Sequence, residues 1–109
     1  MSSDFVQLQT TVDSREAGDD LALRIVEAGL AACVQVLGPI GSTYRWDGEI
    51  ESAAAEWLLL MKTTQQLAEP LMDFVRDRHS YDVPELIVLP IIDGSSEYLD
   101  WVRSQVRSA

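Results

Sequence analysis

Residues 31–62 read AACVQVLGPIGSTYRWDGEIESAAAEWLLLMK, and this stretch decides the fold. Asp47-Gly48 is a favoured two-residue hairpin turn, because both of its central positions tolerate positive φ. The arm before the turn carries apolar residues at mostly alternate positions, namely Val34, Val36, Ile40, Tyr44 and Trp46. The arm after it ends in WLLLM at 57–61, a run typical of a strand buried on both faces. The stretch therefore predicts one long β-hairpin.

The predicted hairpin is too long for a chain of this size. Each arm would extend roughly 50 Å at about 3.3 Å per residue. A compact chain of about 100 residues has a radius of gyration of only about 13 Å. A bend at Gly38-Pro39 and Gly41 is the one local feature that would shorten the first arm. An apolar hairpin that overhangs its own core needs another subunit to cover it, so the sequence predicts an obligate oligomer.

The composition describes an acidic chain with enough apolar residues for a core. Its 109 residues correspond to a single domain, 1–109, and 47% of them are hydrophobic. The formal net charge of −10 comes from 18 acidic and 8 basic residues. This charge repels phosphate backbones and anionic membrane surfaces, so we expect no nucleic-acid partner and no membrane partner. Cations would be attracted weakly and without selectivity.

The first residues and the cysteine content indicate the cytoplasm as the expected compartment. Met1–Phe5 contains no basic region followed by an apolar core, and no apolar run approaches the ~18 residues of a membrane span. Cys33 is the only cysteine, which excludes a disulfide within the chain. Its neighbours, LAACV at 30–34, predict that the thiol is a small buried hydrophobe.

Strands and helices alternate before and after the hairpin. Residues 5–12 predict a strand, and Asp13 is placed to cap a following helix. That helix should end at Gly29, which suits the left-handed position after a last helical turn. A second helix should follow the hairpin, with Thr63 or Thr64 as its cap.

The last third of the chain completes the pattern. Pro70 fits the first turn of the second helix, where a proline is tolerated. The apolar run 85–92 reads as an interior strand, with a bulge or an unpaired edge at Pro90. Ser95 or Ser96 should cap a final helix. The order predicts an α+β protein, a ferredoxin-like α/β sandwich of βαββαβ topology with an added C-terminal helix.

Three blocks of sequence resemble the CutA family of divalent-cation tolerance proteins. The blocks are LAACV at 30–34; STYRWDGEI at 42–50 with Glu56 and Lys62-Thr63; and HSYDVPE at 79–85 with Pro90-Ile91 and Gly94…YLDW at 98–101. The resemblance covers nearly the whole chain. It implies a ferredoxin-like subunit and a tight homotrimer in which long hairpins join sheet edges across subunits. It also implies a loose association with copper and other divalent cations, and no established reaction.

The resemblance also directs attention to possible metal ligands. Some family members are thought to bind copper through a first-strand cysteine and adjacent histidines, which correspond here to Gln9, Arg78 and His79. Family members usually carry proline where this chain has Ser80. His79 is thus the candidate ligand for copper or another divalent cation, and Cys33 is a weaker one. A packing role for Cys33 and a helix-capping role for His79 are favoured alternatives.

Other residues indicate contacts between subunits. Tyr44, Arg45 and Trp46 lie beside the predicted hairpin tip, and such residues are enriched at interface cores, so we expect them at the trimer interface.

Lys62, Tyr81 and Glu85 flank strand ends and could line a cleft between subunits. An ion pair between Lys62 and Glu85 with a purely structural role is the alternative, and the one we weight more heavily.

The sequence carries no catalytic signature. It contains no nucleophile elbow, no phosphate-cradling glycine loop and no zinc-protease motif, so we expect no enzyme and no required cofactor. The leading hypothesis is a non-enzymatic homotrimer linked to divalent-cation tolerance, with weak copper binding. One alternative is a small-molecule sensor like the PII-type trimers, with ligand clefts between subunits. A passive structural or anchoring trimer is the other.

Overall fold

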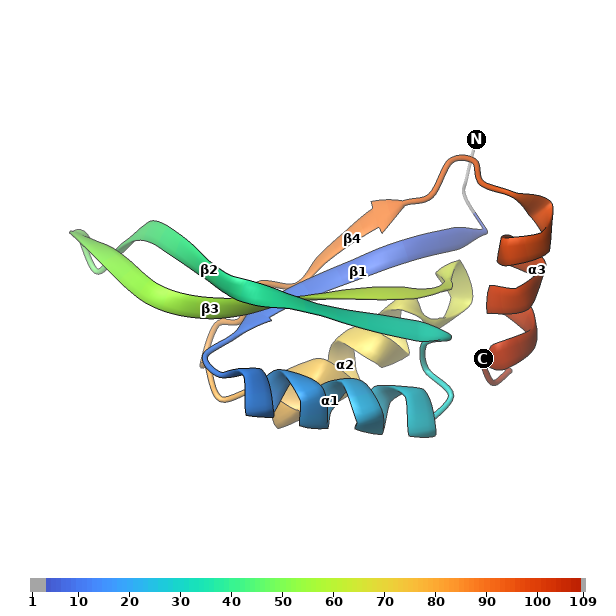
Figure 1. Ribbon diagram of the computed structural model, residues 1–109, viewed down its shortest axis with the longest axis horizontal. Coiled ribbons are helices and arrows are strands. Elements are labelled where there is room, and N and C mark those ends of the chain that lie inside the picture. The colour runs from blue at the N-terminus through green and yellow to red at the C-terminus, as the bar shows by residue number, and fades with distance from the viewer. Residues whose placement is uncertain (1–3, 109) are drawn as a thin grey trace.

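The computed structural model describes residues 4–108, with the backbone alone at residues 53 and 54 (Figure 1). It has an α+β fold, in which a curled antiparallel sheet is accompanied by three helices. The sheet has the strand order β2-β3-β1-β4, and all neighbouring strands are antiparallel. The elements are β1 Phe5–Val12, α1 Arg15–Glu27, β2 Cys33–Trp46, β3 Glu49–Thr64, the 3₁₀ turn Gln65–Leu67, α2 Ala68–Arg78, β4 Ile87–Pro90 and α3 Ser96–Gln105.

One face of the sheet forms the core. Helices α1 and α2 lie along this face, and α3 stands at the end of the molecule away from the hairpin tip (Figure 1). The buried cluster joins both helices to alternate strand residues and consists of Leu8, Val12, Leu21, Ile25, Leu30, Ala31, Leu59, Met61, Leu67, Leu71 and Val75. The prediction that 57–61 is buried on both faces is wrong within one chain. Leu59 and Met61 are fully buried, whereas Leu58 and Leu60, on the opposite face, are only partly buried.

The long hairpin forms as the sequence predicts. Asp47 and Gly48 both have positive φ, 50° and 78°, as the tight turn requires. The arms contain 14 and 16 residues, and their pairing shifts register between Leu37 and Ile40 and again before Ser42. The predicted bend in the first arm therefore occurs, but the hairpin still projects beyond the helices (Figure 1). The molecule measures 44 × 29 × 22 Å with a radius of gyration of 14.5 Å.

Gly38 makes the bend compatible with the core. A Cβ at this position would lie 2.5 Å from Cδ1 of Trp57, a distance that real contacts do not reach. The indole of Trp57 thus packs directly on the backbone of the first arm, at the position where the hairpin leaves the core.

The helix ends refine the sequence predictions. Ser14, not Asp13, caps α1, and its Oγ accepts a hydrogen bond of 3.0 Å from the Ala17 N–H. Gly29 follows the helix with φ of 71°, as predicted. In α3 the cap is Ser95, whose Oγ accepts a 3.2 Å bond from the Tyr98 N–H.

The second helix and the last strand differ more from the prediction. A 3₁₀ turn precedes α2, and Thr64 makes no side-chain capping bond there. Pro70 lies within the first turn of α2, which begins at Ala68, so its missing N–H costs no helical bond. The predicted interior strand 85–92 is wrong, because β4 spans only 87–90 and, among the residues that the structure describes, pairs with β1 alone. It is an edge strand in this chain, the setting in which Pro90 is tolerated.

No helix within residues 4–108 is long and apolar enough to cross a membrane.

Candidate functional site

A groove lies where the hairpin leaves the core. It has a volume of about 930 Å³ and lies between the hairpin and the loop that follows α2. The sheet contributes Thr11, the two arms contribute Gly41–Trp46, Glu51 and Glu56, and the loop contributes residues 81–85. The bend at Gly38 and the sharp exit from α2 bring these distant segments together. The lining combines aromatic rings with several carboxylates and a single guanidinium, that of Arg45.

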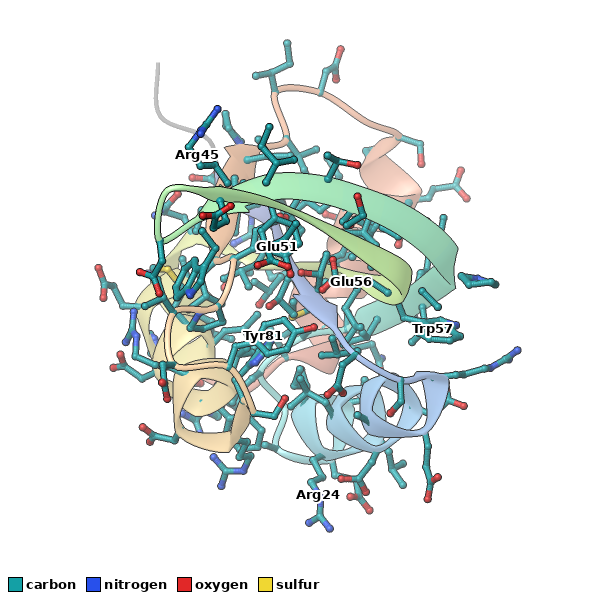
Figure 2. The ribbon with its side chains drawn as sticks, turned by 90° about the vertical axis from the view of Figure 1, so that its left-hand side faces the viewer. Arg24, Arg45, Glu51, Glu56, Trp57 and Tyr81 are labelled. Carbon is teal, nitrogen blue, oxygen red and sulfur yellow. The ribbon has the colours of Figure 1, made fainter. Side chains whose placement is uncertain are left out.

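Glu56 and Tyr81 form the polar contact at the base of this groove. Glu56 is only 7% exposed, and the Tyr81 hydroxyl donates a 2.7 Å hydrogen bond to its Oε2. In Figure 2, which looks onto the hairpin end, the two labelled side chains lie near each other beneath the hairpin ribbon. Burial raises the pKa of Tyr81, and the hydrogen bond and the negative charge of Glu56 raise it further. The phenol therefore stays neutral and serves as a donor.

His79 fixes the loop that carries Tyr81. The ring Nδ1 accepts a 3.0 Å bond from the Tyr81 N–H, and Nε2 lies 2.8 Å from the Thr11 carbonyl oxygen. Since Nδ1 accepts, these partners assign the proton to Nε2, which donates to Thr11. The His79 and Tyr81 rings also contact each other, with centroids 4.8 Å apart. As predicted among the alternatives, His79 occupies the C-cap position of α2.

The other positions of the expected copper site are also engaged. The Gln9 amide donates a 3.1 Å bond to Glu85 Oε2, and the Arg78 guanidinium lies 3.6 Å from the Phe74 ring centroid. Within residues 4–108, no group of three or more His, Cys, Asp or Glu side chains is placed to hold a metal ion. A metal at His79 would have to replace one of the two hydrogen bonds of its ring. Metal ligation by His79 stays a prediction.

Of the three predicted cleft residues, the structure brings two together. Tyr81 and Glu85 both line the groove, whereas Lys62 does not. The Lys62 ammonium donates to Gln35 Oε1, and Glu85 accepts from Gln9 instead. No ion pair joins Lys62 and Glu85 in the described part of the chain, so the structural ion pair proposed as the alternative is wrong within one chain.

Cys33 departs from its prediction as well. It is partly exposed rather than buried, because it points away from α1 and α2 on the same face as Lys62, its neighbour across the strand pair. Burial raises the pKa of Tyr98 in α3, and the neighbouring Cys33 raises it further.

The hairpin tip presents its aromatic rings to solvent. Tyr44 is 46% exposed and Trp46 is 50% exposed, although both line the outer part of the groove. The Arg45 guanidinium donates to the Gly48 carbonyl oxygen over 3.4 Å and so follows the turn rather than the groove base (Figure 2). Exposed apolar side chains that lie together are typical of interaction sites.

Comparison with known proteins decides the family. The sequence model of the CutA1 divalent ion tolerance protein family matches residues 6–105. The chain belongs to this family. A chloroplastic Protein CutA of Arabidopsis thaliana is 47% identical over 103 residues, which make up 94% of this chain but only 56% of that protein. A divalent-cation tolerance protein CutA of Thermus thermophilus is 45% identical over 93 residues, covering 85% of this chain and 89% of that protein.

A solved relative has the same fold. The crystal structure of CutA1 from Oryza sativa matches this CutA-family chain with a TM-score of 0.94 and 39% identity, covering 99% of this chain and 98% of that one. The family is named for tolerance of divalent cations and not for a reaction.

Sequence reasoning did not assign a role to Glu56, Glu51 or Thr11. Glu56 was noticeable as a carboxylate directly before the apolar run 57–61, yet its importance depends on a partner in a distant loop. Thr11 contributes its backbone carbonyl, which no pattern of side chains reveals.

Proposed function

We propose that this CutA-family chain acts in divalent-cation tolerance as a non-enzymatic, cytoplasmic homotrimer, and that its hairpins hold the copies together. The observation that carries the proposal is the hairpin, which projects from the core with Tyr44, Trp46 and Ile50 about half or more exposed. The strand order β2-β3-β1-β4 agrees with that of a ferredoxin-like sandwich. Within residues 4–108, β4 pairs on one side only, so a second copy could add its hairpin there.

Metal binding in this proposal is weak and poorly selective. The net charge of −10 draws cations to the surface in general, and His79 is the one imidazole of the chain. A selective copper or zinc site needs three or four converging N or S ligands. We therefore expect copper to bind at His79 with low affinity, and the side chain of Gln9 to matter less.

Two measurements test the proposal. Light scattering coupled to size exclusion should give three times the chain mass of 12.1 kDa across a wide range of concentrations. A stable monomer in dilute solution would contradict it. Calorimetric titration with copper and zinc should show weak binding that Gln9→Ala reduces little and that His79→Ala reduces clearly. Identical copper affinities of wild type and His79→Ala would exclude His79 as a copper ligand.

The groove favours a second candidate, a small-molecule sensor. A hollow of about 930 Å³ lined by aromatic and charged groups has the size and chemistry of ligand sites. A specific ligand would raise the melting temperature by mass action. A thermal-shift panel of nucleotides and metabolites should therefore contain a compound that stabilises the protein. A passive structural or anchoring trimer would respond to none of them.

A further inference from the structure

Glu56 is a buried carboxylate without a cation. It is more than nine-tenths buried, and its Oε2 accepts from the Tyr81 hydroxyl. None of the ion pairs in this part of the chain includes it. Burying a carboxylate beside a neutral hydrogen-bond donor costs folding free energy, unless a positively charged group from elsewhere pairs with it.

Lys62 is the complementary case. It is the only lysine in the sequence, and the acceptor of its ammonium group is the neutral amide of Gln35. It is partly buried and forms no ion pair within the described chain, although the protein carries 18 acidic residues. The positive charge of Lys62 thus has no opposite charge paired with it within residues 4–108.

Both residues belong to β3 and to one face of the sheet. Side chains alternate along a strand, so Glu56, Leu58, Leu60 and Lys62 share the face that α1 and α2 leave uncovered. Lys62 lies six positions beyond Glu56, or about 20 Å at ~3.3 Å per residue. The two charges cannot meet within one chain. Glu56 lies nearer the hairpin turn and Lys62 nearer the end of β3 at Thr64, at opposite ends of the same half-buried apolar row.

We propose that Lys62 of one copy pairs with Glu56 of another, so that each copy completes the groove of its neighbour. The occupant of the inner groove is then a lysine side chain from a second copy of this chain. The inference rests on the assembly proposed above and adds the contact that sets its register. Charge favours it, because copies of net charge −10 repel each other, and one attractive pair at each contact orients them.

Charge reversal tests the pair. Lys62→Glu and Glu56→Lys should each weaken assembly by at least about tenfold, as expected when one member of a buried pair is lost. Light scattering over a dilution series measures this. The double variant Lys62→Glu/Glu56→Lys should recover most of the loss. A control that pairs Lys62→Glu with Glu49→Lys, at a carboxylate of the hairpin tip outside the groove lining, should recover none.

Mixing the two single variants separates contacts between chains from contacts within a chain. In a mixture, the glutamate introduced at position 62 of one chain can meet the lysine introduced at position 56 of another. In a mixed trimer the native pair also forms at a second contact, where the unchanged Lys62 of the Glu56→Lys chain meets the unchanged Glu56 of a Lys62→Glu chain. Assembly should therefore return, at least in part, although each variant alone is impaired. A contact within one chain would not be rescued by mixing, and that result would overturn the inference.

Milder variants guard against loss of folding. Lys62→Met and Glu56→Gln form a double-mutant cycle, and the inference expects their effects on assembly to be coupled rather than additive. If the effects of the two substitutions are additive while the wild-type protein is a trimer, the ion pair is contradicted and the proposed function stands. If assembly requires added copper and a chelator abolishes it, the ion pair is contradicted, and a metal ion at Glu56 takes the place of Lys62. A monomeric wild type would instead contradict the proposed function itself.

Discussion

The two faces of the sheet are completed in different ways. On the face that α1 and α2 cover, Leu8, Leu59 and Met61 are fully buried. On the other face, Leu37, Ile87 and Leu89 are 44%, 42% and 42% exposed. The same strands supply both faces, since successive side chains alternate. The chain thus completes one hydrophobic core by itself and carries most of the apolar surface of a second one.

This difference separates folding from assembly. Residues on the covered face should determine whether the chain folds, at any concentration. Residues on the open face should matter only when copies meet, because burial there requires another chain. Substitutions at matched residues on the two faces therefore test directly whether one face controls folding and the other controls assembly.

The largest effect is expected from Leu59→Ala in the covered face. It removes a fully buried side chain and leaves a cavity, which typically costs about 2–5 kcal/mol of unfolding free energy. Urea denaturation followed by circular dichroism measures the loss. Leu37→Ala deletes the same groups from the open face and serves as the matched control.

The stability cost of the control substitution, Leu37→Ala, should depend on the protein concentration. Leu37→Ala removes groups that are buried only against another copy, so its cost in unfolding free energy should be smaller than that of Leu59→Ala and should change with the total protein concentration. The cost of Leu59→Ala relative to wild type should not change with concentration. Equal losses for the two variants at every concentration would show that the open face is not open, and the comparison would fail.

The second effect concerns the hairpin tip. Trp46→Ala should weaken assembly by about 2 kcal/mol, the typical size for an aromatic residue at the centre of an interface. The fold of each chain should change little, since the ring is half exposed within one chain. Trp46→Phe keeps an aromatic ring and should retain most of the assembly. Unchanged mass and unchanged melting temperature in Trp46→Ala would exclude Trp46 from the interface.

Local chemistry made much of this fold predictable. Asp47-Gly48 specifies its turn from two residues, and Gly29 and Ser95 end or begin helices through their own backbone and side chain. The error at the first helix was an offset of one residue, because Asp13 and Ser14 are both good caps and only geometry chooses between them.

Long-range placement was not predictable in the same way. The run 85–92 is apolar on both faces and so reads as an interior strand, but its position at the sheet edge depends on which strands pair. The site shows the same limit. Tyr81 and Glu85 were selected and do line the groove, yet Lys62 lies elsewhere and Glu56 was not selected. Both outcomes depend on the path of the loop after α2.

The third prediction concerns the polar contact between Glu56 on β3 and Tyr81 in the loop after α2. Tyr81→Phe removes the hydroxyl bond to Glu56 and should cost about 1.5 kcal/mol, the lower end for a bond to a charged acceptor. The pKa of Tyr81 is raised above its ordinary value of 10.0, so the folded protein holds this proton when the unfolded chain has lost it. Stability should therefore be intact below pH 10 and should fall as pH rises above it.

The matched measurement is the pH dependence of each protein. Wild type should lose stability above pH 10 more steeply than Tyr81→Phe, and the variant should keep a smaller slope from Tyr98, whose pKa is also raised. Parallel slopes for the two proteins would contradict the assigned role of the Tyr81 hydroxyl.

The smallest effect is expected inside the covered face and has the opposite sign. Thr10 is fully buried on β1, and its Oγ1 has no hydrogen-bond partner among the described residues. Valine has nearly the same shape without the hydroxyl, so Thr10→Val should stabilise the protein by about 1 kcal/mol. Thermal unfolding measures the gain, and Thr63→Val is the control. Thr63 is also fully buried but donates a 2.7 Å bond to the Leu30 carbonyl oxygen, so its substitution should destabilise. Because both threonines are buried in the same core, opposite signs would show that hydrogen bonding, and not burial, decides what a polar group costs on this face. Destabilisation by both substitutions would mean that the Thr10 hydroxyl has a partner, such as an internal water.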